Sequence, residues 1–406
     1  MLISILRSPT VRTAVVYAFS GLGFSVGSLL LARKLSPDDY GWVILALTMT
    51  HIVGSMGHLG AATLVVRHRA DASRHLLLRS FMSSAIAALL IVVIARAGYS
   101  MPAAIAAVLL VWSAASSLNR VAAGVFRSRE EFGVSLLLVQ MHNGMLLVVG
   151  IGVLFAPDTG ALAVAIVLAA ALVLSSALGW RLALRAEPRR NATRCDALPW
   201  SEGYTIVAMD TAVVLLISIE RLLIPRLLEI EALAVFAVLA AVVGAPFRVL
   251  QMGIGYTLAP RLRSATSSVQ YRRLAGEEAV VVLALIGIAS LLIWFLAPWV
   301  VDLFLDGKYT LPPLLILAGI VAGLGKVTGA FATAIVTALG DTEHLNRLNR
   351  YSWIALALAV VAGVLGSGFG LVGLVFGVSA GWVVYALISL LIALPRLNLR
   401  HADSGE

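Results

Sequence analysis

The chain alternates between long apolar runs and short polar or basic segments. A helix that crosses the roughly 30 Å hydrocarbon core of a bilayer needs about 20 mostly apolar residues, and each run approaches or exceeds that length. The final two runs are divided at Gly-Ser-Gly-Phe-Gly (366–370), a glycine-rich break that suits a tight turn. The predicted spans are 13–32, 42–66, 76–95, 101–124, 133–155, 161–184, 203–224, 232–258, 278–301, 311–339, 351–369 and 371–394.

The second predicted span carries a polar stripe at helical spacing, formed by Thr48, His51, Ser55 and His58. A spanning helix turns such a stripe toward protein or water rather than toward lipid. We therefore predict one of two roles for His51 and His58. They line a water-filled path, or they form hydrogen bonds between packed helices.

Composition indicates a polytopic membrane protein. Of the 406 residues, 60% are hydrophobic and 13% are charged, whereas a soluble domain carries about 25% charged residues. Arg7 and Arg12 lead into a full-length apolar span, so no cleavable signal peptide is predicted. The net charge of +9 lies mainly between apolar runs, where topology and anionic headgroups explain it better than nucleic acid does. The single cysteine, Cys195, can form no internal disulfide and belongs to no metal-ligand cluster.

The basic residues alternate between loops as the positive-inside rule predicts. With a cytoplasmic N-terminus, the inner loops hold 21 of the 30 Arg and Lys residues and the outer loops hold 6. The remaining three, Arg120, Arg248 and Lys326, lie within predicted spans. This register supports an even number of spans and two cytoplasmic termini.

The longest polar connection, 186–202, divides the spans into two sets of six. We predict a lobe at 1–185, a lobe at 203–395 and a cytoplasmic tail at 396–406. The two halves of the sequence can be aligned by a shift of 193 residues. In this alignment the basic residue and the acidic turn before the second span of each half coincide, pairing Arg33 with Arg226 and Asp38 with Glu231. Transporters often contain such repeats, with the substrate path between them.

Two cations lie deep in their predicted spans. Arg248 is about ten residues from either end, roughly 15 Å at the helical rise, which is far for snorkelling to headgroups. Pro246 favours a bend nearby, and Gln251 continues the polar face one turn on. Lys326 is central in the tenth span. Each cation is predicted either to line a cavity or to pair with a carboxylate between packed helices.

Other polar residues within spans leave alternatives open. Arg120 lies near the cytoplasmic end of the fourth span, where it reaches either a cavity or lipid headgroups. His142 and Asn143 form a weaker polar pair in the fifth span. Asp210 in the seventh span is a candidate ion-coupling site, or the partner of a cation on a neighbouring helix.

Catalytic motifs are absent from the sequence. No HExxH, Walker-type GxxxxGK[ST] or CxxC pattern occurs, and nearly all of the 21 acidic residues lie in loops. We therefore predict neither an enzyme nor a cofactor or metal.

Two segments carry a family resemblance. Residues 31–68, LARKLSPDDYGWVILALTMTHIVGSMGHLGAATLVVRH, join an acid-Tyr-Gly turn to a span that ends in a Gly-Ala-Ala-Thr-Leu-Val element. Residues 338–387 contain a Leu-Gly-Asp turn, a span, a Gly-Leu-Val-Gly turn and a last span. Both resemble the polysaccharide-transporter (O-antigen flippase, Wzx-like) branch of the multidrug/oligosaccharidyl-lipid/polysaccharide (MOP) exporter superfamily.

The resemblance implies an all-α integral membrane fold of twelve transmembrane helices, in two six-helix lobes around a central cavity, MATE-like and working by alternating access. The implied cargo is a polyprenyl-pyrophosphate-linked oligosaccharide in a bacterial inner membrane, with membrane lipids and polysaccharide polymerase or assembly proteins as partners. Arg248, Lys326 and Arg120 would neutralise the diphosphate or acidic sugars, and the histidines His51 and His58 would form hydrogen bonds with sugar hydroxyls. Gln251 is a further expected residue of the same cavity.

Two other functions remain open. An H⁺- or Na⁺-coupled drug antiporter would handle cations, and its cavity should then be acidic or aromatic rather than basic. A non-transporting scaffold of a polysaccharide assembly complex would tolerate neutralisation of the central cations, whereas a flippase should not.

Overall fold

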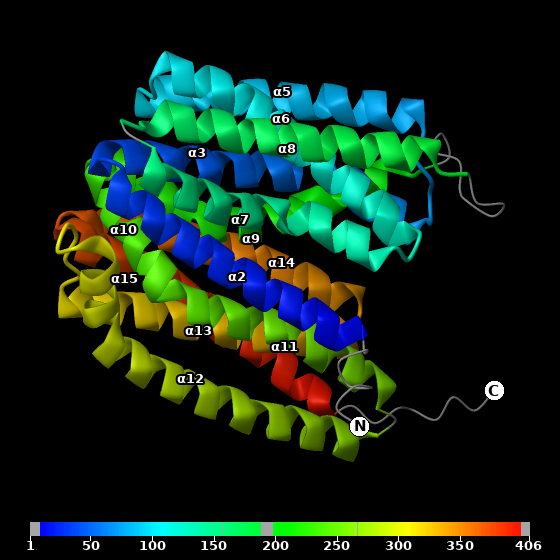
Figure 1. Cartoon of the computed structure of the whole chain (residues 1–406). Helices are drawn as coiled ribbons and strands as arrows, with labels where there is room; N and C mark the ends of the chain where they lie inside the picture. The colour runs from blue at the N-terminus through cyan, green and yellow to red at the C-terminus, as the bar shows by residue number, and fades with distance from the viewer. Residues whose placement is uncertain (1–8, 157, 188–197, 266, 399–406) are drawn as a thin grey trace. The chain divides into compact units, whose positions relative to one another are not determined.

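The computed structural model describes residues 9–156, 158–187, 198–265 and 267–398, and every regular element in this part of the chain is a helix (Figure 1). Cys195 and most of the predicted linker lie outside the described residues. The helices group into two compact units, unit 1 (Met1–Ala237) and unit 2 (Val238–Glu406). The predicted division at 186–202 was based on the long polar connection and on the similarity between the two halves of the sequence. It stays a prediction.

Unit 1 contains eight of the described helices and the start of another. They are α2 (Pro9–Lys34), α3 (Pro37–Met56), α4 (Ala61–Arg67), α5 (Arg74–Tyr99), α6 (Ala103–Ser128), α7 (Phe132–Phe155), α8 (Ala161–Arg185), α9 (Trp200–Leu227) and the first part of α10 (Ile230–Val242). Unit 2 contains the end of α10, then α11 (Gly244–Ser264), α12 (Ser268–Leu305), α13 (Pro313–Leu339), α14 (Thr342–Ser367), α15 (Gly370–Ala393) and the 3-10 helix η2 (Leu394–Asn398).

Eight of the described helices are long and apolar enough to cross a membrane, and the number reaches ten if each of two bent pairs is one span. The chain is therefore a multi-pass membrane protein. The bent pairs are α3 with α4 and α10 with the start of α11. The predicted spans 13–32 and 203–224 correspond to α2 and α9, and a membrane crossing by these two helices stays a prediction.

The predicted span 42–66 is not one continuous helix. Between α3 and α4 the axis bends by 42°. Leu59 and Gly60 lie in the break with φ of 50° and 79°, a left-handed backbone that interrupts a right-handed helix. Gly60 also touches α9, because a Cβ at this position would lie 2.5 Å from the carbonyl oxygen of Gly203. The prediction of continuity is wrong because a contact with a distant segment stabilises the break.

The predicted span 232–258 bends by 52° between α10 and α11. Proline has no N–H, and its ring crowds the carbonyl four residues earlier. For Pro246 that carbonyl belongs to Val242, the last residue of α10. The bend predicted from Pro246 is therefore confirmed, one turn before the proline itself.

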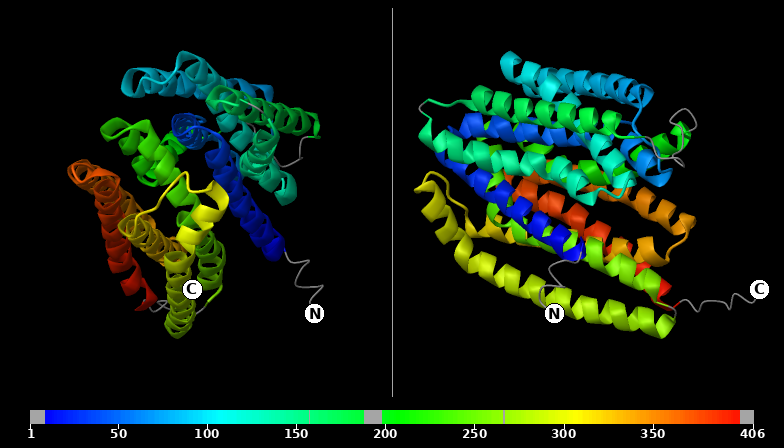
Figure 2. Two further views of the ribbon diagram at one scale, coloured as in Figure 1. Left: turned by 60° about the vertical axis from the view of Figure 1, so that its left-hand side comes forward. Right: turned by 45° about the vertical axis from the view of Figure 1, so that its right-hand side comes forward.

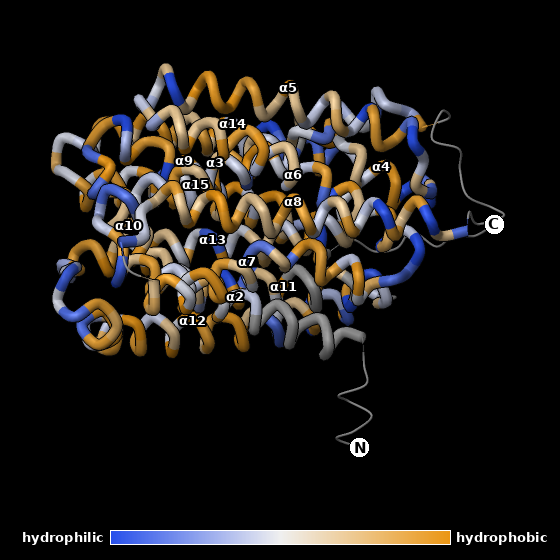
Figure 3. Tube along the Cα trace, turned by 45° about the horizontal axis from the view of Figure 1, so that its top comes forward, coloured by the Kyte–Doolittle hydropathy of each residue, from blue (hydrophilic) through white to orange (hydrophobic). Residues whose placement is uncertain are grey.

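Close approaches at small residues join the helices within each unit. In unit 1, a Cβ on Gly27 of α2 would lie 2.6 Å from the carbonyl oxygen of Leu146 on α7. In unit 2, α13 and α14 both pack against α15, and α14 and α15 lie side by side in orange and red (Figure 2). Membrane helices use small residues for such contacts because lipid tails give them no hydrophobic reason to associate. Apolar residues run along most of α5 and most of α12, as suits lipid-facing helices (Figure 3).

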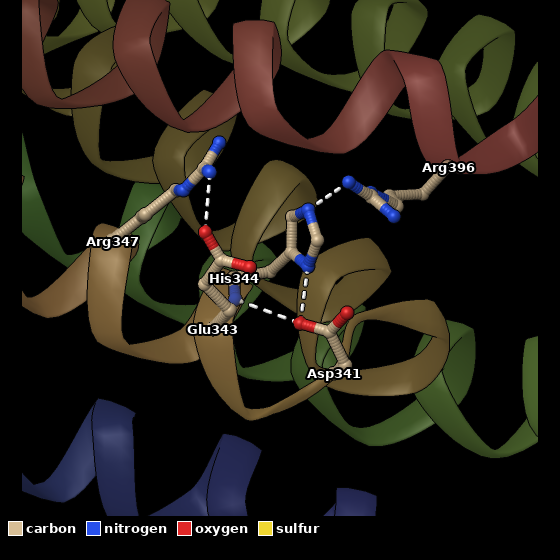
Figure 4. Close-up of polar contacts among 5 residues, drawn as sticks. All are labelled: Asp341, Glu343, His344, Arg347 and Arg396. Atoms are coloured by element: carbon tan, nitrogen blue, oxygen red, sulfur yellow. Dashed lines mark hydrogen bonds and ion pairs between the residues drawn. The ribbon is translucent and has the colours of Figure 1, made fainter.

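A polar cluster fixes the start of α14 in unit 2 (Figure 4). The carboxylate of Asp341 accepts a hydrogen bond from the backbone N–H of His344 at 3.0 Å and a second from its ring Nδ1. Arg396 of η2 donates to the other ring nitrogen of His344. This chain of contacts caps α14 and ties η2 to it.

Candidate functional site

A polar cluster lies in unit 1 around α6, which packs against both α3 and α7. Arg120 of α6 donates from Nη2 to Nδ1 of His51 on α3 at 3.3 Å. Because arginine can only donate, Nδ1 of this imidazole carries no proton. The two helices approach closely at Gly54, where a Cβ would collide with the Ser116 hydroxyl of α6.

Two more imidazoles lie within electrostatic range of the Arg120 guanidinium. His58 lies in the break after α3 and is 6% exposed, and His142 of α7 has its ring centroid 5.9 Å from that of Trp112 on α6. The charge of Arg120 acts on both imidazoles. The buried atoms Nδ1 of His58, Nε1 of Trp112 and Oγ of Ser113 have no hydrogen-bond partner among the described residues. Buried polar atoms are nearly always paired, so these three atoms are exceptions among the described residues.

The structure thus brings Arg120 of one predicted span to His51 and His58, which were predicted together as the polar stripe of another span. Of the two environments predicted for Arg120, the contact with His51 corresponds to the one inside the protein. A role of these residues in substrate binding stays a prediction. Trp112 was not predicted, because a single tryptophan in an apolar span carries no pattern of its own.

An amide group beside His142 links α7 to α2. Asn143 donates from Nδ2 to the Ser20 hydroxyl at 2.8 Å and to Oε1 of Gln140 at 3.1 Å, and Ser20 donates to the same Oε1. These contacts leave the three side chains satisfied mainly by one another. Ser20 and Gln140 were missed, although two amides at i and i+3 within an apolar span were a usable signal.

In unit 2, Lys326 lies over an aromatic ring. Its Nζ lies 5.2 Å from the ring centroid of Trp382 on α15, a cation–π distance. Trp382 meets Tyr385 edge-on at 5.9 Å, and the Tyr385 hydroxyl is 3.1 Å from that of Thr333 on α13. Gly329 allows this arrangement, because a Cβ there would lie 2.9 Å from the Tyr385 ring. The Gly/Thr face that follows Lys326 therefore serves helix packing.

Arg248 and Gln251 lie on α11, which packs against α13. Phe247, which precedes Arg248 in the chain, has its ring directly on Gly323 of α13, where a Cβ would collide with it. Arg248 and Lys326 are one and three residues away from this contact on their respective helices. The predicted pair of cations therefore lies on two helices that touch, and the roles of Arg248, Lys326 and Gln251 stay predictions.

Asp210 is exposed on α9 and forms no hydrogen bond or ion pair with any residue that the structure describes. The predicted cation partner on a neighbouring helix is not brought to it, and ion coupling stays a prediction. Across the described ranges, no three His, Cys, Asp or Glu side chains gather to hold a metal ion.

Comparison with known proteins places these features in a family context. Residues 30–318 match a family model described as "Polysaccharide biosynthesis protein". No curated protein matches the chain.

Solved structures share the fold at low sequence identity. The inward-facing conformation of a multidrug resistance MATE family transporter of the MOP superfamily matches with a TM-score of 0.69 at 14% identity, covering 93% of this chain and 94% of that one. The lipid II flippase MurJ in an inward closed conformation matches with a TM-score of 0.66 at 12% identity, covering 95% and 91%. A mutant of the Vibrio cholerae MATE transporter VcmN matches with a TM-score of 0.60 at 15% identity, covering 97% of each chain. The fold is therefore MATE-like.

Proposed function

We propose that the chain is a flippase for a lipid-linked oligosaccharide, because it belongs to the polysaccharide biosynthesis protein family of the MOP superfamily. The cargo is a polyprenyl-pyrophosphate-linked precursor of O-antigen or exopolysaccharide. It crosses a bacterial inner membrane by alternating access without direct use of ATP, beside polysaccharide polymerase or assembly proteins. The likeness to a lipid II flippase supports a lipid-linked cargo.

The observation that carries this proposal is the cationic cluster around Arg120. Its guanidinium lies in a membrane span, donates to His51 and forms no ion pair with a described carboxylate. A charge in a span is costly unless it is paired, and such residues mark substrate paths. A diphosphate supplies the missing negative charge, and charge-assisted hydrogen bonds from arginine to phosphate are among the strongest. The buried donors nearby suit the hydroxyls of a sugar.

An ion-coupled drug antiporter is the second candidate. The multidrug transporters among the structural neighbours and the unpaired carboxylate of Asp210 favour it. Cations such as Arg120 and Lys326 would repel cationic drugs, and they therefore argue against this second function. An Asp210→Asn variant separates the roles, because transport with an unchanged dependence on the ion gradient removes Asp210 as coupling site.

The test uses a gene deletion complemented by variants that insert normally into the membrane. Arg248→Ala/Lys326→Ala should leave lipid-linked precursor on the inner leaflet and deplete surface glycan. Arg347→Ala/Arg350→Ala is the matched control, because it removes two exposed cations from α14 of the same unit.

Three outcomes decide between the functions. Full export by the Arg248→Ala/Lys326→Ala variant would show that these two cations do not bind cargo in a cavity. This outcome favours the non-transporting scaffold. Unchanged glycan in the deletion strain contradicts the flippase, provided that no second transporter replaces it. Equal depletion of surface glycan in the two double variants would mean that a general loss of basic charge, rather than loss of the two cations within spans, causes the defect in export.

A further inference from the structure

One face of α5 forms an apolar groove with a basic end. A ridge at i, i+4, i+8 and i+12 lies beside a floor of small residues, and the groove is open on one side, with a volume of about 500 Å³. This volume lies within the usual range of about 300–1,000 Å³ for small-molecule sites. The ridge consists of Leu78, Met82, Ile86 and Leu90, each more than half exposed, and the floor of Ser83 and Ala87.

The groove has the length of one membrane leaflet. It runs from His75 to Leu90, 15 residues along a helix, or about 22 Å at 1.5 Å per residue. Half of a bilayer with its headgroups is about 20–22 Å thick. A lipid that lies along the groove therefore places its headgroup beside His75 and Arg79 when its chain ends near Leu90.

Arg79 is fixed at the basic end by residues of α9. The centre of its guanidinium lies 3.7 Å from the ring centroid of Trp200, and Nη2 donates to the Tyr204 hydroxyl at 3.4 Å. Contact with an aromatic face does not use the N–H donors at the edge of the guanidinium, and arginine recognises phosphate with two parallel hydrogen bonds from that edge. The side chain is thus arranged before any ligand arrives.

The nearby carboxylates are already occupied by other cations. Glu202 forms ion pairs with Arg67 at 2.7 Å and with His68 at 3.0 Å, and the buried ion pair of Asp71 with Arg129 has a distance of 2.9 Å. Neither acid is left to neutralise Arg79, so the basic end of the groove attracts an anion. Basic side chains at the membrane surface select anionic lipids.

We propose that this groove binds an anionic phospholipid, with its phosphate at Arg79 and His75 and one acyl chain along the ridge of α5. The bound headgroup contacts Arg79, which already bridges α5 to Trp200 and Tyr204 at the start of α9. The lipid therefore stabilises the contact between these two helices. The site is separate from the Arg120 cluster and does not depend on the proposed transport.

Native mass spectrometry of the purified protein tests the proposal, with phosphatidylglycerol and phosphatidylcholine as probes. The wild type should retain phosphatidylglycerol in preference to phosphatidylcholine. Arg79→Ala should weaken retention of phosphatidylglycerol about fivefold, the usual effect of one basic residue at an anionic surface. Ala87→Trp should abolish it by filling the floor of the groove, and it leaves the Arg79 contacts in place if Arg79→Ala proves unstable.

Two matched controls should retain lipid like the wild type. Ala97→Trp makes the same change at an exposed alanine of α5 outside the groove, and Arg185→Ala removes an exposed arginine at the end of α8. Equal retention of both lipids by the wild type, or unchanged retention by Ala87→Trp, overturns the proposal. Displacement of phosphatidylglycerol by an equal amount of a polyprenyl phosphate also overturns it, because the groove then belongs to the path of the cargo.

Discussion

The two units hold their span cations in different ways. In unit 1, Arg120 donates a hydrogen bond to the imidazole of His51, and two further imidazoles lie near it. In unit 2, Lys326 lies over the face of Trp382, whose helix is brought close by glycines of α13. The first arrangement depends on directed donors and acceptors, and the second depends on an aromatic surface that attracts any cation.

This difference predicts that the two cations have different roles in the proposed flippase. A guanidinium oriented by a hydrogen bond presents its remaining donors in a fixed plane, which suits recognition of a diphosphate. An ammonium over an indole is a point charge on a flexible stem, which suits attraction without a fixed geometry. Substitutions that keep charge but change shape should therefore affect the units unequally.

Removal of the unit 1 cation should have the largest effect. In Arg120→Met we expect transport to fall about 10- to 100-fold, because a hydrogen bond to a charged group contributes about 1.5–3 kcal/mol. Thermal stability should stay level or rise, since the variant no longer buries a charge in a span. Flipping of lipid-linked oligosaccharide in vesicles and a melting curve measure the two quantities.

Arg127→Met is the matched control for this variant, because Arg127 is exposed at the end of the same helix. It should transport like the wild type. A melting temperature of Arg120→Met that falls as steeply as its transport would assign Arg120 to the fold rather than to the cargo.

A reciprocal exchange of the two cations should have the next largest effect. Arg120→Lys should lower transport about tenfold, since a lysine cannot present the fork of donors at the same point. Lys326→Arg should stay within about threefold of the wild type, because arginine also binds the face of a tryptophan. Equal losses in the two variants would mean that both units depend on directed geometry, and the comparison would fail.

The sequence predicted the span helices well because their signal is local. Runs of about 20 apolar residues and Pro246, four residues after Val242, act through neighbours in the chain. The break at Gly60 was missed because it depends on Gly203, which is 143 positions away and becomes a neighbour only after packing.

The sequence identified some residues of the candidate site, but it did not predict which of them contact each other. His51 and Arg120 stand out in the sequence because polar groups in spans are rare. Their hydrogen bond requires α3 and α6 to meet at Gly54, a position that periodicity does not mark. Trp112 was missed for the same reason, since its meaning depends on the ring of His142 on another helix.

A smaller effect is expected from a packing change that tests the aromatic surface of unit 2. A Cβ on Gly325 would lie 2.9 Å from Cβ of Trp382. Gly325→Ala should therefore lower the free energy of unfolding by about 1–3 kcal/mol through overpacking and displace Trp382 from Lys326. Chemical denaturation and tryptophan fluorescence measure these changes. The control Gly287→Ala on α12, where a Cβ meets nothing within 4 Å, should raise stability slightly because alanine favours helix.

The smallest effect is expected at Asp341, a polar residue outside both cation clusters. Hydrogen bonds from the backbone and the ring of His344 lower the pKa of Asp341 below its ordinary value of 3.8. A lowered pKa means that the native state favours the carboxylate, so its stabilisation is present above pH 3.8 and is lost as the pH falls below it. Asp341→Asn keeps a capping side chain and removes the charge. The variant should melt slightly below the wild type at pH 7, converge with it in acid and transport normally. Loss of transport would show that contacts at the start of α14 act on the cation clusters.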